Sequence, residues 1–262
     1  MTWALLQTGF LPAELNMNID IALARNFGNS NGIPILRFYG WNPPAISIGY
    51  NQEEDEFDRE KLSTAGVDLV RRPTGGRAIL HWNELTYSVV IPIQQRSLHE
   101  IYSTINTALL AGVRLLGINA EFVNVSSTSE QLYHQQESAA CFSSSAKSEI
   151  QFEGKKLVGS AQRRFGTVVL QHGSILLGPQ HVQIASLLTD TLQDRELIVK
   201  RHLENHAIDV ETAIGKIVTF EEASISLQQG FEQALSVTFM KPEQALNEMI
   251  EQILHEARID VH

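Results

Sequence analysis

The stretch "VRRPTGGRAILHWNELTYSVV" spans residues 70–90 and joins two expected strands through a turn that contains two glycines. The segment that follows the turn, "LTYSVVIPI", is dense in β-branched residues, which indicates a strand buried on both faces. In the turn, Thr74, Gly75 and Gly76 can bring backbone N–H groups close to a ligand, with arginine side chains beside them. The stretch therefore predicts either a site for a carboxyl, phosphate or carbonyl oxygen or a plain tight turn.

Helices and strands mix along the rest of the chain. The 3.6-residue periodicity predicts helices in "LPAELNMNIDIALARN" and "SLHEIYSTINTALLAGVRLLG", and alternation predicts strands in "IPILRFYGW", "AISIGYN" and "TVVLQHGSILLG". "EIQFEGKKLVGSA" predicts a hairpin that turns at Glu153 and Gly154, and the acidic run "NQEEDEFDRE" indicates a solvated helix face. After Pro179 the pattern is helical, with a capping box from Thr219 to Glu222. We expect one mixed α/β domain over 1–212 and a helical appendage over 213–262.

Charge and composition narrow the function. The 262 residues carry a formal net charge of −10, which argues against nucleic acid as a partner. Basic residues nevertheless gather in two clusters, one around Arg71, Arg72 and Arg77 and the other around Lys155 and Lys156. Such clusters suit a small anionic ligand or an acidic protein partner, although a solvated charged face fits the arginines at 163 and 164 equally well.

Cys141 is the one cysteine of the chain. A single cysteine excludes an intrachain disulfide and a cysteine-based metal cluster, and it is consistent with a reducing compartment. A lone cysteine is most often a small buried hydrophobe, but this one lies in a polar, Ser/Gln-rich segment over about 124–148, and loops of that length are usually functional or disordered.

The sequence also predicts that a membrane span and a metal site are absent. The N-terminus lacks a basic leader and no apolar run reaches the length of a membrane span, so we expect a cytoplasmic protein without membrane contact. His81 alone is more often structural than catalytic, and no group of histidines or acids has a metal-ligand spacing that predicts a metal site.

Three segments in order, "RFYGWNPPAISIGYNQ", "VRRPTGGRAILHWNELTYSVV" and "GKKLVGSAQRRFGTVVLQHGSILL", resemble the biotin/lipoate ligase superfamily. Within it they resemble the octanoyltransferases that charge lipoyl domains. Arg77 stands where the ATP-dependent lipoate ligases of the superfamily have a third glycine, and an "ACF" cysteine precedes the "KKLVGSA" lysine, as in the transferase branch. Trp82 stands where an aspartate usually follows the histidine of the motif, which argues against a role for a His81–carboxylate pair.

The resemblance implies an α/β (α+β) fold with a mixed, largely antiparallel sheet flanked by helices. It implies that Cys141 is the nucleophile that accepts the acyl group and that Lys156 faces the acyl carbonyl. An apolar tunnel formed by "LTYSVV" and "TVVLQHG" would hold the eight-carbon chain. The remaining substrate-binding residues are then Arg72, Thr74, Gly75, Gly76, His81, Gly159, Ser160, Ala161, His172 and Gly173.

The implied reaction takes octanoyl from octanoyl-acyl carrier protein and passes it to a lysine of a lipoyl domain, such as that of the glycine cleavage H protein. Because a thioester is converted to an amide, the reaction runs downhill, and we expect no cofactor, no metal and a monomer. Three alternatives stay open: an ATP-dependent lipoate ligase, an amidotransferase that moves octanoyl between lipoyl domains, and a lipoyl-domain binder without catalysis. Cys141 and Lys156 together weigh against the last.

Overall fold

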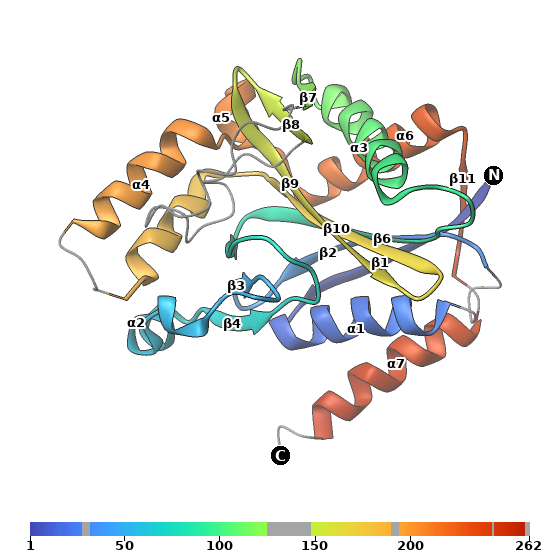
Figure 1. Ribbon diagram of the computed structural model, residues 1–262, viewed down its shortest axis with the longest axis horizontal. Coiled ribbons are helices and arrows are strands. Elements are labelled where there is room, and N and C mark those ends of the chain that lie inside the picture. Colours follow the sequence, from blue (N-terminus) through green and yellow to red (C-terminus); the bar gives the residue numbers. More distant parts are fainter. Residues whose placement is uncertain (28–31, 125–147, 190–193, 243, 260–262) are drawn as a thin grey trace.

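The computed structural model describes residues 1–27, 32–124, 148–189, 194–242 and 244–259. Within these residues a large sheet forms the centre of the molecule, with strands in the spatial order β11-β1-β2-β6-β10-β9-β8-β7 (Figure 1). β1 runs parallel to both of its neighbours, and every pair from β2 to β7 is antiparallel. The expected mixed, largely antiparallel sheet is confirmed. Its strands are β1 (Thr2–Leu11), β2 (Ile35–Trp41), β6 (Glu84–Pro92), β7 (Glu121–Asn124), β8 (Ser148–Phe152), β9 (Lys155–Phe165), β10 (Val168–Leu176) and β11 (Thr238–Met240).

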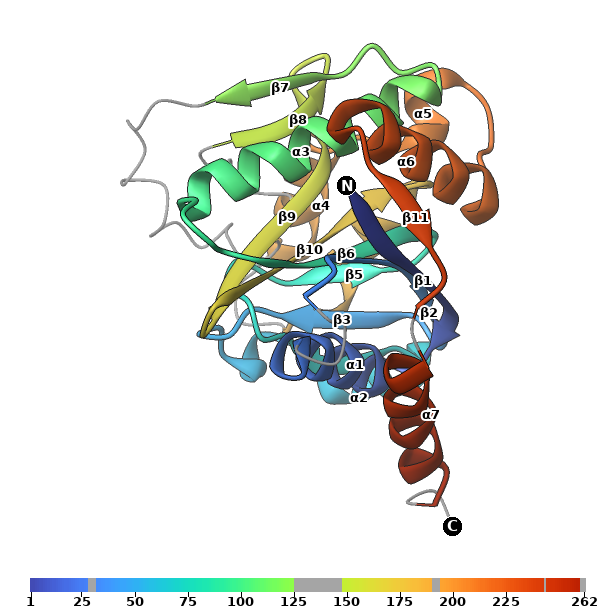
Figure 2. The same cartoon turned by 90° about the vertical axis from the view of Figure 1, so that its right-hand side faces the viewer.

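Two layers cover the large sheet (Figure 2). Helices α3 and α6 lie on one face, whereas α1 and a small three-stranded sheet of order β4-β3-β5 lie on the other. The small sheet consists of β3 (Ala45–Ile48), β4 (Asp68–Arg71) and β5 (Ile79–His81). The helices are α1 (Ala13–Arg25), α2 (Arg59–Ala65), α3 (Leu98–Leu115), α4 (Arg195–His206), α5 (Val210–Ile214), α6 (Phe220–Leu235) and α7 (Gln244–Ile259), with 3-10 segments η2 (Glu54–Glu56) and η5 (Pro179–Leu187).

Strand β6 is buried on both faces, as its β-branched sequence predicts. Leu85, Tyr87 and Val89 contribute to the core under α3 and α6. On the opposite face Val90 packs into the core under α1, and Ser88 contacts α1 through a hydrogen bond. β6 therefore lies between the two layers and pairs with β2 and β10, which both contribute residues to the site described below.

Local signals in the sequence also fix one hairpin turn and one helix start. Glu153 and Gly154 both have positive φ, 51° and 75°, which is the conformation of a two-residue hairpin turn, and the β8–β9 hairpin turns there as predicted. The capping box at Thr219 and Glu222 is present at the start of α6, where each residue bonds the backbone N–H of the other.

Other segments differ from the expectation. The acidic run after residue 50 forms η2 and then α2, which begins after the Asp58 cap, instead of one helix. The expected loop over 124–148 begins and ends in strands, because Asn124 closes β7 and Ser148 opens β8; residues 125–147 lie outside the described residues. β1, which the sequence pattern did not predict, pairs with β2 and is the second strand from one edge of the sheet.

One of the C-terminal helices, α6, is part of the main hydrophobic core. α6 packs against α3 so closely that a Cβ on Gly230 would lie 2.2 Å from the backbone nitrogen of Gly112, and only glycine fits there. β11 adds a parallel strand beside β1. The division of the chain at residue 212 stays a prediction. Over the described residues, no helix has both the length and the apolar character that crossing a bilayer demands.

A fully buried ion pair connects α1 to the sheet. Arg37 on β2 donates to Asp20 on α1 over 2.7 Å, and neither side chain is exposed to solvent. The guanidinium also donates to the backbone carbonyl and the side-chain oxygen of Asn16 and to Thr8, so its donors are satisfied on three sides. Burial raises the pKa of Asp20, but Arg37 and the hydrogen bonds from His172 and Ser88 outweigh it and leave that pKa lowered.

Arg37→Met should destabilise the protein by about 3–5 kcal/mol, because it leaves the Asp20 carboxylate buried without its cation. Urea unfolding followed by circular dichroism measures this change. Arg59→Met is the matched control: Arg59 pairs with Glu54 at 2.8 Å, but both side chains are largely in water, so the loss should stay below about 1 kcal/mol. Equal losses in the two variants would contradict the importance of the buried pair.

The same pair should make stability depend on pH. Because the folded-state pKa of Asp20 is lowered, its contribution is fully present above the unfolded value of about 3.9 and is lost as the pH falls through the lower folded value. The acid limb of the unfolding free energy should therefore be shallower in Arg37→Met than in the wild type.

Candidate active site

A cavity of about 430 Å³ lies between the small sheet and strands β2, β6, β9 and β10 of the large sheet. Its size is that of a small-molecule pocket. Nine of the twelve predicted site residues line it: Arg72, Gly76, His81, Lys156, Gly159, Ser160, Ala161, His172 and Gly173. Strand, loop and hairpin segments up to a hundred residues apart in the sequence therefore meet at one cavity, as the three motifs predict.

The other three predicted residues do not line the cavity. Thr74 is fully buried behind the wall, where it hydrogen-bonds His172. Gly75 is exposed in the turn, and its carbonyl accepts from Arg72. Cys141 lies outside the described residues.

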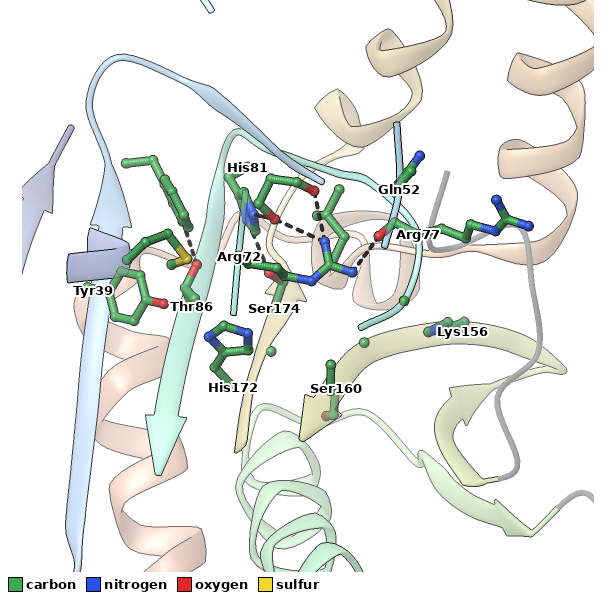
Figure 3. A pocket seen from close by; sticks show the side chains of 18 of the residues that line it. Tyr39, Gln52, Arg72, Arg77, His81, Thr86, Lys156, Ser160, His172 and Ser174 are labelled. Carbon is green, nitrogen blue, oxygen red and sulfur yellow. Dashed lines mark hydrogen bonds between the residues drawn. The ribbon is translucent and has the colours of Figure 1, made fainter. Parts of the chain in front are cut away.

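Charged and polar groups mark one end of the cavity. In Figure 3, Lys156, Arg77 and Gln52 lie on the side opposite to Tyr39 and Thr86. The Lys156 ammonium lies 2.6 Å from the Glu149 carboxylate, and both side chains are almost fully buried. A buried ammonium at one end of the cavity can stabilise negative charge that develops on a bound carbonyl oxygen.

Arg71, the last residue of β4, and Arg72, which follows it, hold the backbone at the cavity wall. Arg72 donates to the carbonyls of Ser47, Gly75 and Arg77, and Arg71 donates to carbonyls in the segment that follows β3. Gly76 has a φ of 95°, and its carbonyl passes so close to Gly49 that a Cβ there would lie 1.9 Å from it. The glycines are thus required by a tight backbone crossing at the cavity wall.

The opposite end of the cavity is aromatic. Met17, Tyr39, Trp41 and Ile79 line it and are buried. Trp41 donates its indole N–H to Thr86 at 2.7 Å, and Tyr39 donates its hydroxyl to Asp20 at 2.9 Å. Because each ring is tied by a hydrogen bond, this end has a fixed shape suited to an apolar chain.

His81 forms the carboxylate pair that the sequence argued against. Its Nδ1 lies 2.7 Å from Glu84, three residues along the chain, so the missing aspartate at position 82 is replaced by a carboxylate on β6. The partners assign the tautomer: Nδ1–H donates to Glu84, and Nε2 accepts from Ser47 at 2.7 Å. The ring also stacks on Trp41 at 4.0 Å.

This Ser47–His81–Glu84 chain has the spacing of a serine-hydrolase triad. Glu84, however, also accepts from Thr86 and Ser174, and the indole of Trp41 covers one face of the imidazole. The network therefore joins β3, β5, β6 and β10 and fixes the aromatic end of the cavity.

His172 belongs to the network of the buried ion pair. Its Nδ1 donates to Asp20 at 3.0 Å, and its Nε2 accepts from Thr74 at 2.6 Å. Burial lowers the pKa of His172 against the opposing effect of Asp20, so the ring is neutral near pH 7. A neutral His172 connects the cavity floor to the Thr-Gly-Gly turn.

Sequence reasoning missed the residues that complete the cavity and its networks. They are Met17, Asp20, Arg37, Tyr39, Trp41, Ser47, Asn51, Gln52, Ile79, Glu84, Thr86, Glu149 and Ser174. An arginine inside the hydrophobic strand "ILRFYGW" was one available signal, because a charge there needs a buried partner. Among the described residues no group of three or more histidines and acids has the arrangement of a metal site.

Comparisons with known proteins agree with this site. A family model described as the lipoyl protein ligase A/B catalytic domain matches residues 12–232. The octanoyltransferase LipM of Kyrpidia tusciae is 43% identical over 242 residues, which cover 89% of this chain and 87% of that protein. LipM of Bacillus subtilis is 34% identical over 260 residues, which cover 97% and 93%.

Solved structures agree on the fold. A bipartite lipoate protein ligase of Thermoplasma acidophilum, studied with its E2 lipoyl domain, superposes with a TM-score of 0.77 at 21% identity, over 97% of this chain and 92% of that one. A lipoate-protein ligase A bound with ATP gives a TM-score of 0.75 at 23% identity, over 97% and 94%. The family model and the curated relatives cover most of the chain, and the protein therefore belongs to the lipoyl protein ligase A/B catalytic domain family.

Proposed function

We propose that the protein transfers an octanoyl group to a lysine of a lipoyl domain through a thioester on Cys141. The observation that carries the proposal is a cavity with a fixed aromatic end and a buried lysine at its other end. Relatives that are 34–43% identical over most of the chain are named octanoyltransferases, which favours this chemistry over the others of the family.

The aromatic end suits the acyl chain. At about 0.8 kcal/mol for each buried methylene, the six methylenes of an octanoyl group supply on the order of 5 kcal/mol of binding. With the tail at the aromatic end, the carbonyl would point towards Lys156 and Arg77, which lie on the side of the cavity opposite to Tyr39 (Figure 3). Of the segments expected to form the tunnel, "LTYSVV" contributes Thr86 and "TVVLQHG" contributes His172 and Gly173.

The reaction consists of two acyl transfers. The Cys141 thiolate attacks the octanoyl thioester of the donor, and the donor sulfur leaves as a thiolate as the acyl-enzyme forms. The neutral amine of the acceptor lysine then attacks the acyl-enzyme, the cysteine sulfur leaves as a thiolate, and the nitrogen loses one proton to solvent as the amide forms. In both steps Lys156 would stabilise the negative charge on the carbonyl oxygen.

The chain connectivity supports Cys141 in this role. β8 begins at Ser148, seven residues after the cysteine, and an extended chain spans at most about 25 Å over that length. Glu149, the next residue of β8, contacts Lys156 directly. The segment that carries the sulfur is therefore attached beside the charged end of the cavity.

The proposed donor is octanoyl-acyl carrier protein, and the proposed acceptor is a lipoyl domain such as that of the glycine cleavage H protein. We also propose that the protein is a monomer and lies in the cytoplasm. The ATP-dependent ligase is the main rival, because the fold is shared with a ligase that binds ATP. Arg77, which replaces the third glycine of the ligase motif and lines the cavity, favours the transferase. An amidotransferase would differ in its donor.

Transfer should need no nucleotide, because the donor is already a thioester. The measurement is acylation of a lipoyl domain from octanoyl-carrier protein after apyrase treatment, with octanoyl-lipoyl domain as a second donor for the amidotransferase. We expect full activity with the carrier protein. Activity that appears only with ATP and free octanoate would instead identify a ligase.

Lys156→Ala should slow the alkylation of Cys141 by iodoacetamide at pH 7, because it removes a positive charge that favours the thiolate. Lys155→Ala is the matched control, since Lys155 is the preceding residue and donates to the carbonyl of Glu204 away from the cavity. Rates measured from pH 6 to 10 should separate the two variants. Identical profiles would mean that another group sets the reactivity of the thiol.

A further inference from the structure

The carboxylate of Glu149 has no place in the mechanism so far. It lies 2.6 Å from the Lys156 ammonium, and the two side chains are 3% and 6% exposed. Burying two charges to this degree costs folding free energy unless the charges pair with each other. Because Lys156 is the one lysine among the described residues that lines the cavity, the burial of its carboxylate partner calls for an explanation.

A β-bulge brings the two side chains together. Along the β8–β9 hairpin the pair Ile150–Val158 is followed by the pair Gln151–Lys156, so Leu157 is one extra residue on β9. Bulges of this kind bend a strand and change the direction in which a side chain points.

The bulge places the side chain of Lys156 on the opposite face of the sheet. Cross-strand partners share a face, and so do residues two apart on one strand, so Lys156 lies on the face of Gln151 and Glu149. Without the bulge Lys156 would oppose Phe152, whose face packs on the core of the large sheet. The backbone is held there too, because the carbonyl of Lys156 accepts from Ile208 at 3.0 Å.

We propose that Glu149 is a positioning residue for Lys156, which keeps the ammonium charged and directed at the acyl carbonyl. A buried amine without an anionic partner tends to lose its proton, and a carboxylate within 3 Å opposes that loss. A neutral amine could not stabilise the carbonyl oxygen as an ammonium does. This assignment rests on the proposed function, because it assumes that the charge of Lys156 acts on an acyl group.

Glu149→Gln tests the assignment, because the amide keeps the shape and one hydrogen bond but removes the charge. We expect kcat for transfer to fall roughly tenfold or more while the KM for the acyl donor stays within about twofold. The alkaline limb of the pH–rate profile, where Lys156 loses its proton, should move about one pH unit or more towards lower pH. Glu149→Asp, which retains the charge, should restore most of that limb.

A second readout does not depend on transfer. The rate at which acetic anhydride labels Lys156, followed by mass spectrometry across pH, reports how much of the amine is neutral. Its midpoint should fall in Glu149→Gln and remain unchanged in Glu153→Gln, the matched control, which removes an exposed carboxylate from the turn of the same hairpin.

The outcomes separate the two proposals. A shifted labelling midpoint in a protein that transfers nothing would leave the Glu149–Lys156 assignment standing and reject the proposed function. An unchanged labelling midpoint and an unchanged alkaline limb in folded Glu149→Gln would reject the assignment, and a parallel loss of stability alone would show that the pair only packs the hairpin.

Discussion

The buried contact between Arg37 and Asp20 is the interaction on which the rest of this structure depends. It fixes α1 against the centre of the large sheet. The Asp20 carboxylate is also hydrogen-bonded to Tyr39 on β2, Ser88 on β6 and His172 on β10, so these strands are held in place as well. Each of these side chains donates to the one carboxylate, so helix and strands cannot shift independently without leaving a buried polar group unpaired. A charged pair at this position thus sets the geometry of a site that it does not itself line.

Two separate sets of contacts fix the two ends of the cavity. At the aromatic end, Tyr39 is held by Asp20, and Trp41 is held by Thr86 and by the stacked ring of His81. At the charged end, a bulge in β9 turns Lys156 towards Glu149. A rigid apolar end and a directed charge are what acyl transfer requires: the tail is bound by shape, and binding places the carbonyl beside the ammonium.

The sequence predicted features that depend on near neighbours. The hairpin turn at Glu153 and Gly154, the capping box of α6 and the two-sided burial of β6 follow from local conformational preference and from hydrophobic pattern, and all are confirmed. The three motifs contain every residue that lines the cavity except Met17, because glycines and charges beside strands mark a place where backbone and ligand meet, although only nine of these residues were predicted as site residues.

The missed features depend on partners that no local pattern specifies. Asp20 and Arg37 are seventeen residues apart, and no sequence pattern around either residue identifies the other as its partner. The sequence argued against a carboxylate partner for His81, because position 82 holds a tryptophan, but Glu84 at the start of β6 supplies that carboxylate. The contact between Glu149 and Lys156 depends on one extra residue in a hairpin, which shifts a side chain to the other face and leaves no trace in the hydrophobic pattern.

The most direct test of a cysteine-linked acyl transfer on this scaffold is the intact mass of the protein after it is mixed with octanoyl-carrier protein and no acceptor. The chain has a single thiol, so one octanoyl group should appear on Cys141. Hydroxylamine should remove it, as it removes thioesters but not amides, and a lipoyl domain should discharge it. If no adduct forms, and Cys141→Ala acylates the lipoyl domain at the wild-type rate, then the transfer does not pass through this cysteine.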